Sequence, residues 1–254
     1  MKAITKKISL LIMLSAVLFL SSCLDSGSNS YIGNEEYSFI TRDETTGLVY
    51  ARTPASHFIT SPKISLLDPG TVAFLTYQIT EETETVSIGE NGIVHKVNLG
   101  AEPKEIIQKS LQLTTPPDTD TVYFENIIAP PVWVTSSSFY FGDRWPLTYQ
   151  YKAKKGENVR LSFYKVSDEN LPDDLNADVL IDIRIEKLGM PEDGAKEELK
   201  NDLIVANMSL LRGMSSSGDS QETKQLIVKF RFFRSDKKNE LHIFDQPITI
   251  TVQK

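Results

Sequence analysis

The sequence has a single cysteine, Cys23, which excludes an internal disulfide framework and any Cys-x-x-Cys metal or redox site. It also lacks the Gly-x-Ser-x-Gly elbow of α/β-hydrolases, a glycine-rich phosphate loop and a dinucleotide-binding fingerprint. Its three histidines, His57, His95 and His242, lie far apart and show no spacing typical of a metal site. We therefore predict no metal and no cofactor, and the motifs indicate no enzyme.

Clusters of basic residues are scarce as well. The chain carries 34 acidic and 27 basic residues, with a formal charge of −7. Its two basic pairs, Lys154-Lys155 and Lys237-Lys238, are too short to neutralise a run of phosphates, so nucleic acid is not an expected partner. With 254 residues, of which 40% are hydrophobic, the chain is long enough for one large or two small globular domains.

The clearest signal that is present lies at the N-terminus. Lysines at positions 2, 6 and 7 precede an uncharged, largely apolar run over residues 8–22. As a helix this run would extend only ~22 Å, short of the ~30 Å hydrocarbon core of a membrane. Residues 1–22 are therefore predicted to be a signal peptide for export.

The tetrapeptide Leu20-Ser21-Ser22-Cys23 resembles a bacterial lipobox. The resemblance implies cleavage before Cys23 and acylation of that cysteine, with palmitate among the acyl chains, and two or three chains give stable membrane anchoring. Leu24 follows where an Asp would favour the inner membrane, so lipoprotein-sorting rules imply the outer membrane and leave its periplasmic or surface face open. Residues 23–34 are rich in Ser, Gly and Asn and are predicted to form a flexible tether.

Short β-branched and aromatic segments separated by turn residues predict a first β domain over residues 35–113. In the strand expected at residues 72–79, alternate residues from Ala73 to Ile79 are predicted to face the core, with partial cover on the opposite face. Asp68-Pro69-Gly70, directly before this strand, has the composition of a tight turn.

Residues 114–120 contain two prolines, two acidic residues and no apolar side chain, which predicts a linker and a domain boundary. Beyond it, roughly seven or eight short strands over residues 121–254 favour an antiparallel β-sandwich. In the strand expected at residues 178–187, alternate residues from Val179 to Ile185 are predicted to face the core, while Asp182, Arg184 and Glu186 face water.

The lipobox, the first β domain with its segments at residues 37–43 and 71–79, and the second β domain together resemble the NigD-like lipoproteins of Bacteroidota. The resemblance covers nearly the whole chain after the signal peptide and rests on layout. It implies a small OB-like β-barrel followed by a β-sandwich, and a role in bacteriocin immunity. It carries over no functional residue. Thr121, in Asp120-Thr121-Val122, also resembles a Bacteroidota O-glycosylation signal.

Two stretches of the second domain are candidates for binding. Aromatic residues are dense over residues 133–149, where they form either a stacking platform for a sugar or peptide or part of the core. Residues 141–145 are predicted to be a loop, so Phe141, Arg144 and Trp145 are the candidate ligand-binding residues. Five carboxylates over residues 168–178 suggest either calcium ligands without EF-hand spacing or a solvated acidic loop.

The function predicted from these features is a lipid-anchored, monomeric, non-enzymatic envelope protein that binds a partner protein or a glycan. Two alternatives stay open. A hydrolase could assemble its catalytic residues from dispersed positions, which linear spacing does not reveal. A subunit of a surface fibre could exchange a strand between neighbouring molecules.

Overall fold

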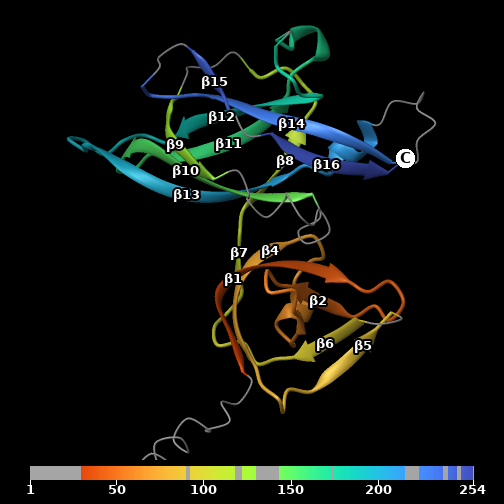
Figure 1. Cartoon of the computed structure of the whole chain (residues 1–254). Coiled ribbons are helices and arrows are strands. Elements are labelled where there is room, and N and C mark those ends of the chain that lie inside the picture. The colour runs from red at the N-terminus through yellow and green to blue at the C-terminus, as the bar shows by residue number, and fades with distance from the viewer. Residues whose placement is uncertain are drawn as a thin grey trace, which may run out of the picture.

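The computed structural model describes residues 30–89, 92–117, 122–129, 143–172, 174–214, 223–236, 240–244 and 247–253. Over these ranges the chain forms two curled β-sheets, which confirms the predicted mainly β fold class of a small barrel followed by a sandwich. We call the parts built on the two sheets the first and the second unit. Figure 1 shows the first unit in orange and yellow below the second in green and blue.

The first unit contains a seven-stranded sheet with strand order β5-β6-β3-β2-β1-β4-β7. A short 3-10 helix, η1 (Ile64–Leu66), follows β3. The strands are β1 (Tyr31–Arg42), β2 (Val49–Arg52), β3 (Phe58–Thr60), β4 (Val72–Ile79), β5 (Thr85–Ile88), β6 (Gly92–Lys96) and β7 (Lys104–Glu105).

Strand β4 follows the predicted alternation. Ala73, Leu75, Tyr77 and Ile79 are buried in the core of the first unit, whereas the opposite face of β4 carries Val72, which is buried against the second unit. The turn before β4 is also as predicted, because the Thr71 amide donates to the Asp68 carbonyl and Gly70 adopts a φ of +94°.

The second unit contains a nine-stranded sheet with strand order β15-β14-β12-β11-β8-β13-β10-β9, and β16 also pairs with β14. The 3-10 helices η3 (Asp168–Asn170) and η4 (Ser209–Met214) lie between strands of this unit. The strands are β8 (Gln108–Gln112), β9 (Phe124–Ala129), β10 (Arg144–Lys154), β11 (Asn158–Lys165), β12 (Val179–Leu188), β13 (Glu197–Asn207), β14 (Thr223–Phe233), β15 (Leu241–Ile243) and β16 (Ile248–Gln253).

Strand β8 joins the two halves of this sandwich. It pairs in parallel with β13 at one end and with β11 at the other, and β12 and β14 are parallel as well. The other pairings between described strands of the unit are antiparallel, and an isolated parallel bridge joins Phe124 and Arg234. Alternate side chains of the strands meet in one large core that includes Trp145, Phe163, Ile183 and Phe230.

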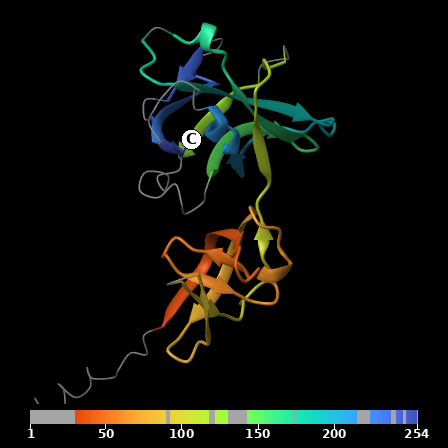
Figure 2. The ribbon, with the colours of Figure 1, turned by 90° about the vertical axis from the view of Figure 1, so that its right-hand side faces the viewer.

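The chain passes from one unit to the other at Ile106 and Ile107. The Ile106 amide donates to the Val72 carbonyl of the first unit, and the Ile107 carbonyl accepts from the Val205 amide of the second, both at 2.9 Å. The crossing therefore precedes residues 114–120, where the sequence placed the boundary. Composition marked a polar, proline-rich stretch, but β8 had already entered the second sheet before it (Figure 2).

Within the described ranges, no helix has the length and apolar character needed to cross a membrane.

Candidate functional site

A cleft of about 810 Å³ lies in the second unit, where β8, β11 and β12 end or begin beside β14. This volume falls in the range of ligand-binding sites, about 300–1,000 Å³. The segment after β8, predicted to be a linker, forms one wall of the cleft. The apolar lining residues are Leu113, Pro116, Val166, Val179 and Leu226.

The acidic segment of residues 168–178 covers the outer face of the sheet beside this cleft. Leu171, Leu175 and Ala177 pack with Leu180 of β12 and Ile243 of β15, so the segment is held by apolar contacts. Asp168 forms an ion pair with Lys165, and the Asp178 carboxylate accepts the Ile227 amide at 2.7 Å. Among the described residues, no group of three or more His, Cys, Asp or Glu side chains could hold a metal ion.

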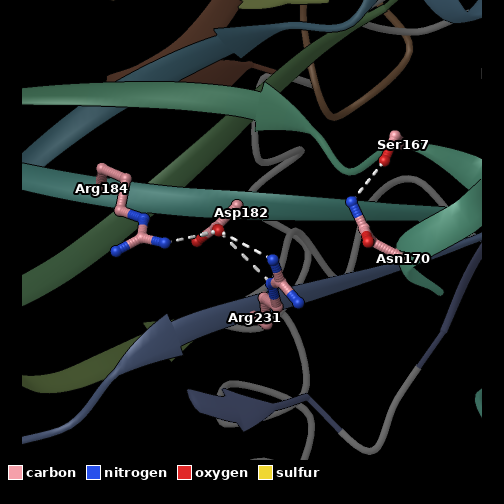
Figure 3. A network of polar contacts seen from close by, with 5 residues as sticks. All are labelled: Ser167, Asn170, Asp182, Arg184 and Arg231. Carbon is pink, nitrogen blue, oxygen red and sulfur yellow. Dashed lines mark hydrogen bonds and ion pairs between the residues drawn. The ribbon is translucent and has the colours of Figure 1, made fainter. Parts of the chain in front are cut away.

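Asp182 is the most deeply buried charge of this region, with 0% of its surface exposed. Its Oδ2 accepts a hydrogen bond from Arg184 Nη2 at 2.8 Å and two from Arg231, from Nη2 at 3.1 Å and from Nε at 3.3 Å. Figure 3 shows the two guanidinium groups on either side of the carboxylate, with the Ser167–Asn170 hydrogen bond nearby. We call Asp182, Arg184 and Arg231 the arginine–aspartate network.

Neighbouring strands and an aromatic ring fix the positions of the side chains in the arginine–aspartate network. Asp182 and Arg231 are register partners on the parallel strands β12 and β14, so their side chains lie on the same outer face. Arg184 stacks over the Phe233 ring at 4.7 Å, which orients its guanidinium. Two polar atoms of the network, Asp182 Oδ1 and Arg184 Nε, are buried and have no hydrogen-bond partner among the residues that the structure describes.

The sequence predicted that Asp182 faces water, and this expectation is wrong. The alternation of β12 placed Asp182 correctly on the face opposite the core residues Ile181 and Ile183. That face is covered by the acidic segment and by β15, and cover from elements distant in the chain leaves no mark on strand periodicity. The one available signal was a carboxylate two residues from an arginine within a strongly apolar strand.

The nominated residues Arg144 and Trp145 lie in strand β10, so the predicted loop is corrected at these two positions. Trp145 has 1% of its surface exposed and meets Phe230 edge-on, with ring centroids 5.9 Å apart. It is therefore a core residue, the other interpretation of the aromatic stretch. Phe141, the third nominated residue, lies outside the described residues, as do Cys23 and Thr121.

Arg144 connects the two units. Its Nε donates to the Gly70 carbonyl of the first unit at 3.2 Å, and its Nη1 donates to Asn207 Oδ1 of the second unit at 2.8 Å. Burial lowers the pKa of the Arg144 guanidinium, against the opposing influence of Asp143. A Cβ on Gly70 would lie 3.1 Å from Arg144 Nη2, so a glycine allows this approach. The residue fixes the junction and does not face the cleft.

A second polar cluster lies in the first unit. The Glu36 carboxylate accepts hydrogen bonds from the Tyr31 and Tyr77 hydroxyls, the latter at 2.8 Å. His57 packs edge-on against Tyr31, with centroids 4.4 Å apart, and lies 6.2 Å from His95. The fold thus brings together two of the three histidines, while the third, His242, lies in β15 of the second unit.

The fold and the cleft define a class: a two-unit, mainly β protein with an amphipathic cleft in its second unit. No protein-family model matches the chain, and no curated protein matches it. Solved structures that resemble it include a NigD-like immunity protein from Bacteroides caccae, with 10% identity and a TM-score of 0.43 over 86% of this chain and 92% of that chain.

A candidate lipoprotein from Bacteroides fragilis is 12% identical, with a TM-score of 0.46 over 89% of this chain and 98% of the other. A protein of unknown function from Bacteroides vulgatus is 13% identical, with a TM-score of 0.47 over 86% and 92%. The NigD-like family that the sequence layout resembles is thus represented among similar solved structures. Likeness at this level assigns no activity to the chain.

Proposed function

We propose that this chain is a lipid-anchored, non-enzymatic protein of the outer membrane that binds a segment of a partner protein in the cleft of its second unit. The anchoring half of the proposal comes from the sequence. The lipobox at Cys23 supplies an acyl anchor, and the polar tether before β1 separates the folded units from the lipid. The folded units would therefore stand clear of the membrane surface and present the cleft to a partner.

The observation that carries the binding half is the lining of the cleft. Exposed Leu113, half-buried Pro116 and buried Val166 and Val179 line the cleft together with the Arg231 side chain. The lining combines these apolar side chains with polar and charged ones, and placed polar groups beside apolar surface are typical of binding sites for extended peptide segments. None of the described lining residues is aromatic, so a stacking platform for a sugar ring has no support here.

The charged groups of the cleft support binding over catalysis. Asp168 is paired with Lys165, Asp178 accepts a backbone amide, and Arg231 is bound to Asp182. A hydrolase needs a general base directed at a nucleophile or at a water, and each of these carboxylates already serves a structural contact. The histidines at positions 57, 95 and 242 do not line the cleft.

The fibre alternative has less support. Strand β14, which would have to receive a donated strand, pairs with β12 on one side and with β15 and β16 on the other. Both edges of β14 are therefore paired within the chain, and we propose a monomer.

Site-specific photo-crosslinking in the native host tests the binding half. A photoreactive amino acid at Leu113, 58% exposed in the cleft, should capture one defined protein. The same group at Leu199, 55% exposed on β13 and outside the cleft lining, is the matched control. Equal capture at both positions, or none at Leu113, would remove the cleft as the binding site.

Metabolic labelling with an alkyne fatty acid tests the anchor. Wild-type protein should carry the label and fractionate with the outer membrane, whereas Cys23→Ala should be unlabelled. Unlabelled wild-type protein in a soluble fraction would overturn this half of the proposal.

A further inference from the structure

Like Lys165, which pairs with Asp168, Arg231 is a half-buried cation that lines the cleft. Only 19% of its side-chain surface is exposed, and its Nε and Nη2 are engaged by Asp182 Oδ2. Within the described part of the chain its Nη1 group has no acceptor. A guanidinium held on one side by a carboxylate keeps its remaining N–H donors in a fixed plane, which is the geometry that recognises a second carboxylate.

The charges around Arg231 do not balance. Asp182 is one negative charge between two guanidiniums, and no other carboxylate contacts either arginine among the described residues. The two further carboxylates of the cleft lie at its rim, where Asp168 has 79% of its side chain exposed and pairs with Lys165. Asp178 is exposed as well and accepts the Ile227 amide. Exposed charges are screened by solvent and salt, so the excess positive charge at Arg231 dominates the interior of the cleft.

We propose that Arg231 anchors a carboxylate of the bound segment, so that the cleft selects acidic peptides. Arg184 and Asp182 act as positioning residues. Asp182 holds the Arg231 guanidinium in place, and Arg184 keeps the network cationic by matching the Asp182 charge, so that the charge of Arg231 stays available to a ligand. The apolar residues Leu113, Val166 and Val179 exclude water from the contact, which strengthens a charge-assisted hydrogen bond.

This inference rests on the proposed function, because it names the chemistry of a segment bound in the same cleft. A display library of random dodecapeptides tests it, with the chain from residue 23 onward carrying Cys23→Ala as the target. All contacts described here lie within residues 30–253, so this target retains them. We expect wild type to enrich peptides with Asp or Glu over the input library.

Three variants locate the selectivity. In Arg231→Gln the enrichment of acidic residues should disappear, and affinity for a peptide selected by wild type should fall at least about tenfold. Arg231→Lys, which keeps the charge without the planar fork, should retain part of the acidic preference. Arg160→Gln removes an exposed arginine of the same sheet, paired with Glu186, and should select the same peptides as wild type with affinity within about twofold.

The outcomes separate the two proposals. If wild type selects no peptides above background, peptide binding itself is wrong. If wild type selects peptides without acidic enrichment, and Arg231→Gln selects the same ones, the carboxylate anchor is wrong while peptide binding stands. Thermal unfolding of every variant excludes misfolding as the cause, and the Lys variant keeps the test valid if the Gln variant is unstable.

Discussion

Each of the two units contains a carboxylate that accepts hydrogen bonds from two other side chains, but these side chains differ in charge. In the first unit the Glu36 carboxylate accepts hydrogen bonds from two neutral tyrosine hydroxyls. In the second, Asp182 lies between two guanidiniums, one of which lines a cleft. Hydroxyls donate hydrogen bonds to a carboxylate without adding charge, whereas two arginines around one aspartate give the cluster a net charge of +1. The first arrangement suits a scaffold, and the second suits a binding site.

The largest effect is expected in the core that supports the second cluster. Trp145→Ala removes a ring with 1% exposure and leaves a cavity beside Phe230, which should lower the free energy of unfolding by about 3–5 kcal/mol. Urea unfolding followed by circular dichroism measures it. Leu199→Ala, at an exposed position, should change the value by less than about 0.5 kcal/mol. A small loss of unfolding free energy for Trp145→Ala would contradict the burial of this ring in the core.

Removing the buried charge of the second unit should have the next largest effect. Asp182→Asn leaves two guanidiniums facing each other across a neutral amide, and we expect a loss of about 2–3 kcal/mol, because both arginines keep some access to water. Glu186 lies on the same strand as Asp182 and forms an exposed ion pair with Arg160 of β11. Glu186→Gln, which breaks this pair, should cost under about 1 kcal/mol. Equal losses for the two variants would show that the network does not differ from a surface ion pair.

The corresponding change in the first unit should be milder. Glu36→Gln keeps an acceptor for one tyrosine, and we expect a loss of about 1–2 kcal/mol. The same variant also tests what controls the pKa values of the two tyrosines. The hydrogen bond to Glu36 is the main cause that raises the pKa of Tyr31, whereas burial is the main cause for Tyr77.

An alkaline titration that follows each tyrosine separately therefore distinguishes the pKa of Tyr31 from that of Tyr77. In Glu36→Gln the pKa of Tyr31 should fall toward its ordinary value, while that of Tyr77 should stay raised. If both pKa values fall together, the carboxylate and not burial controls the whole cluster.

The smallest effect is expected on the free energy of unfolding at acid pH. Burial, and secondly the neighbouring His57, lower the pKa of His95 below its ordinary value of 6.5. The unfolded chain then binds this proton more readily than the folded one. The free energy of unfolding should therefore fall as the pH drops below about 6.5, by under about 1 kcal/mol for this partly exposed ring.

Urea midpoints between pH 7.5 and 5 measure this slope. His95→Gln should remove it, and His57→Gln should only reduce it, because burial is the larger cause. An unchanged slope in His95→Gln would assign the acid sensitivity to other groups.

Several features of the fold could be predicted because they depend on local chemistry. The alternation in β4 and β12 placed Leu75 and Ile183 in their cores, and Pro69-Gly70 marked the turn before β4. The candidate site could not be predicted in the same way. The cleft is lined by residues from 113 to 231 of the chain, and nothing in any one segment records which others come to lie beside it.

The sequence by itself predicts the export signal and the lipobox at Cys23, and it determined the mainly β class and which face of each alternating strand is apolar. These follow from short-range patterns of charge, size and periodicity. Only the tertiary structure decided that Asp182 is buried, that Arg144 joins the units and that Arg231 lines a cleft. Each of these depends on cover or contact from elements distant in the chain, and the burial of a charge is set by what packs over it.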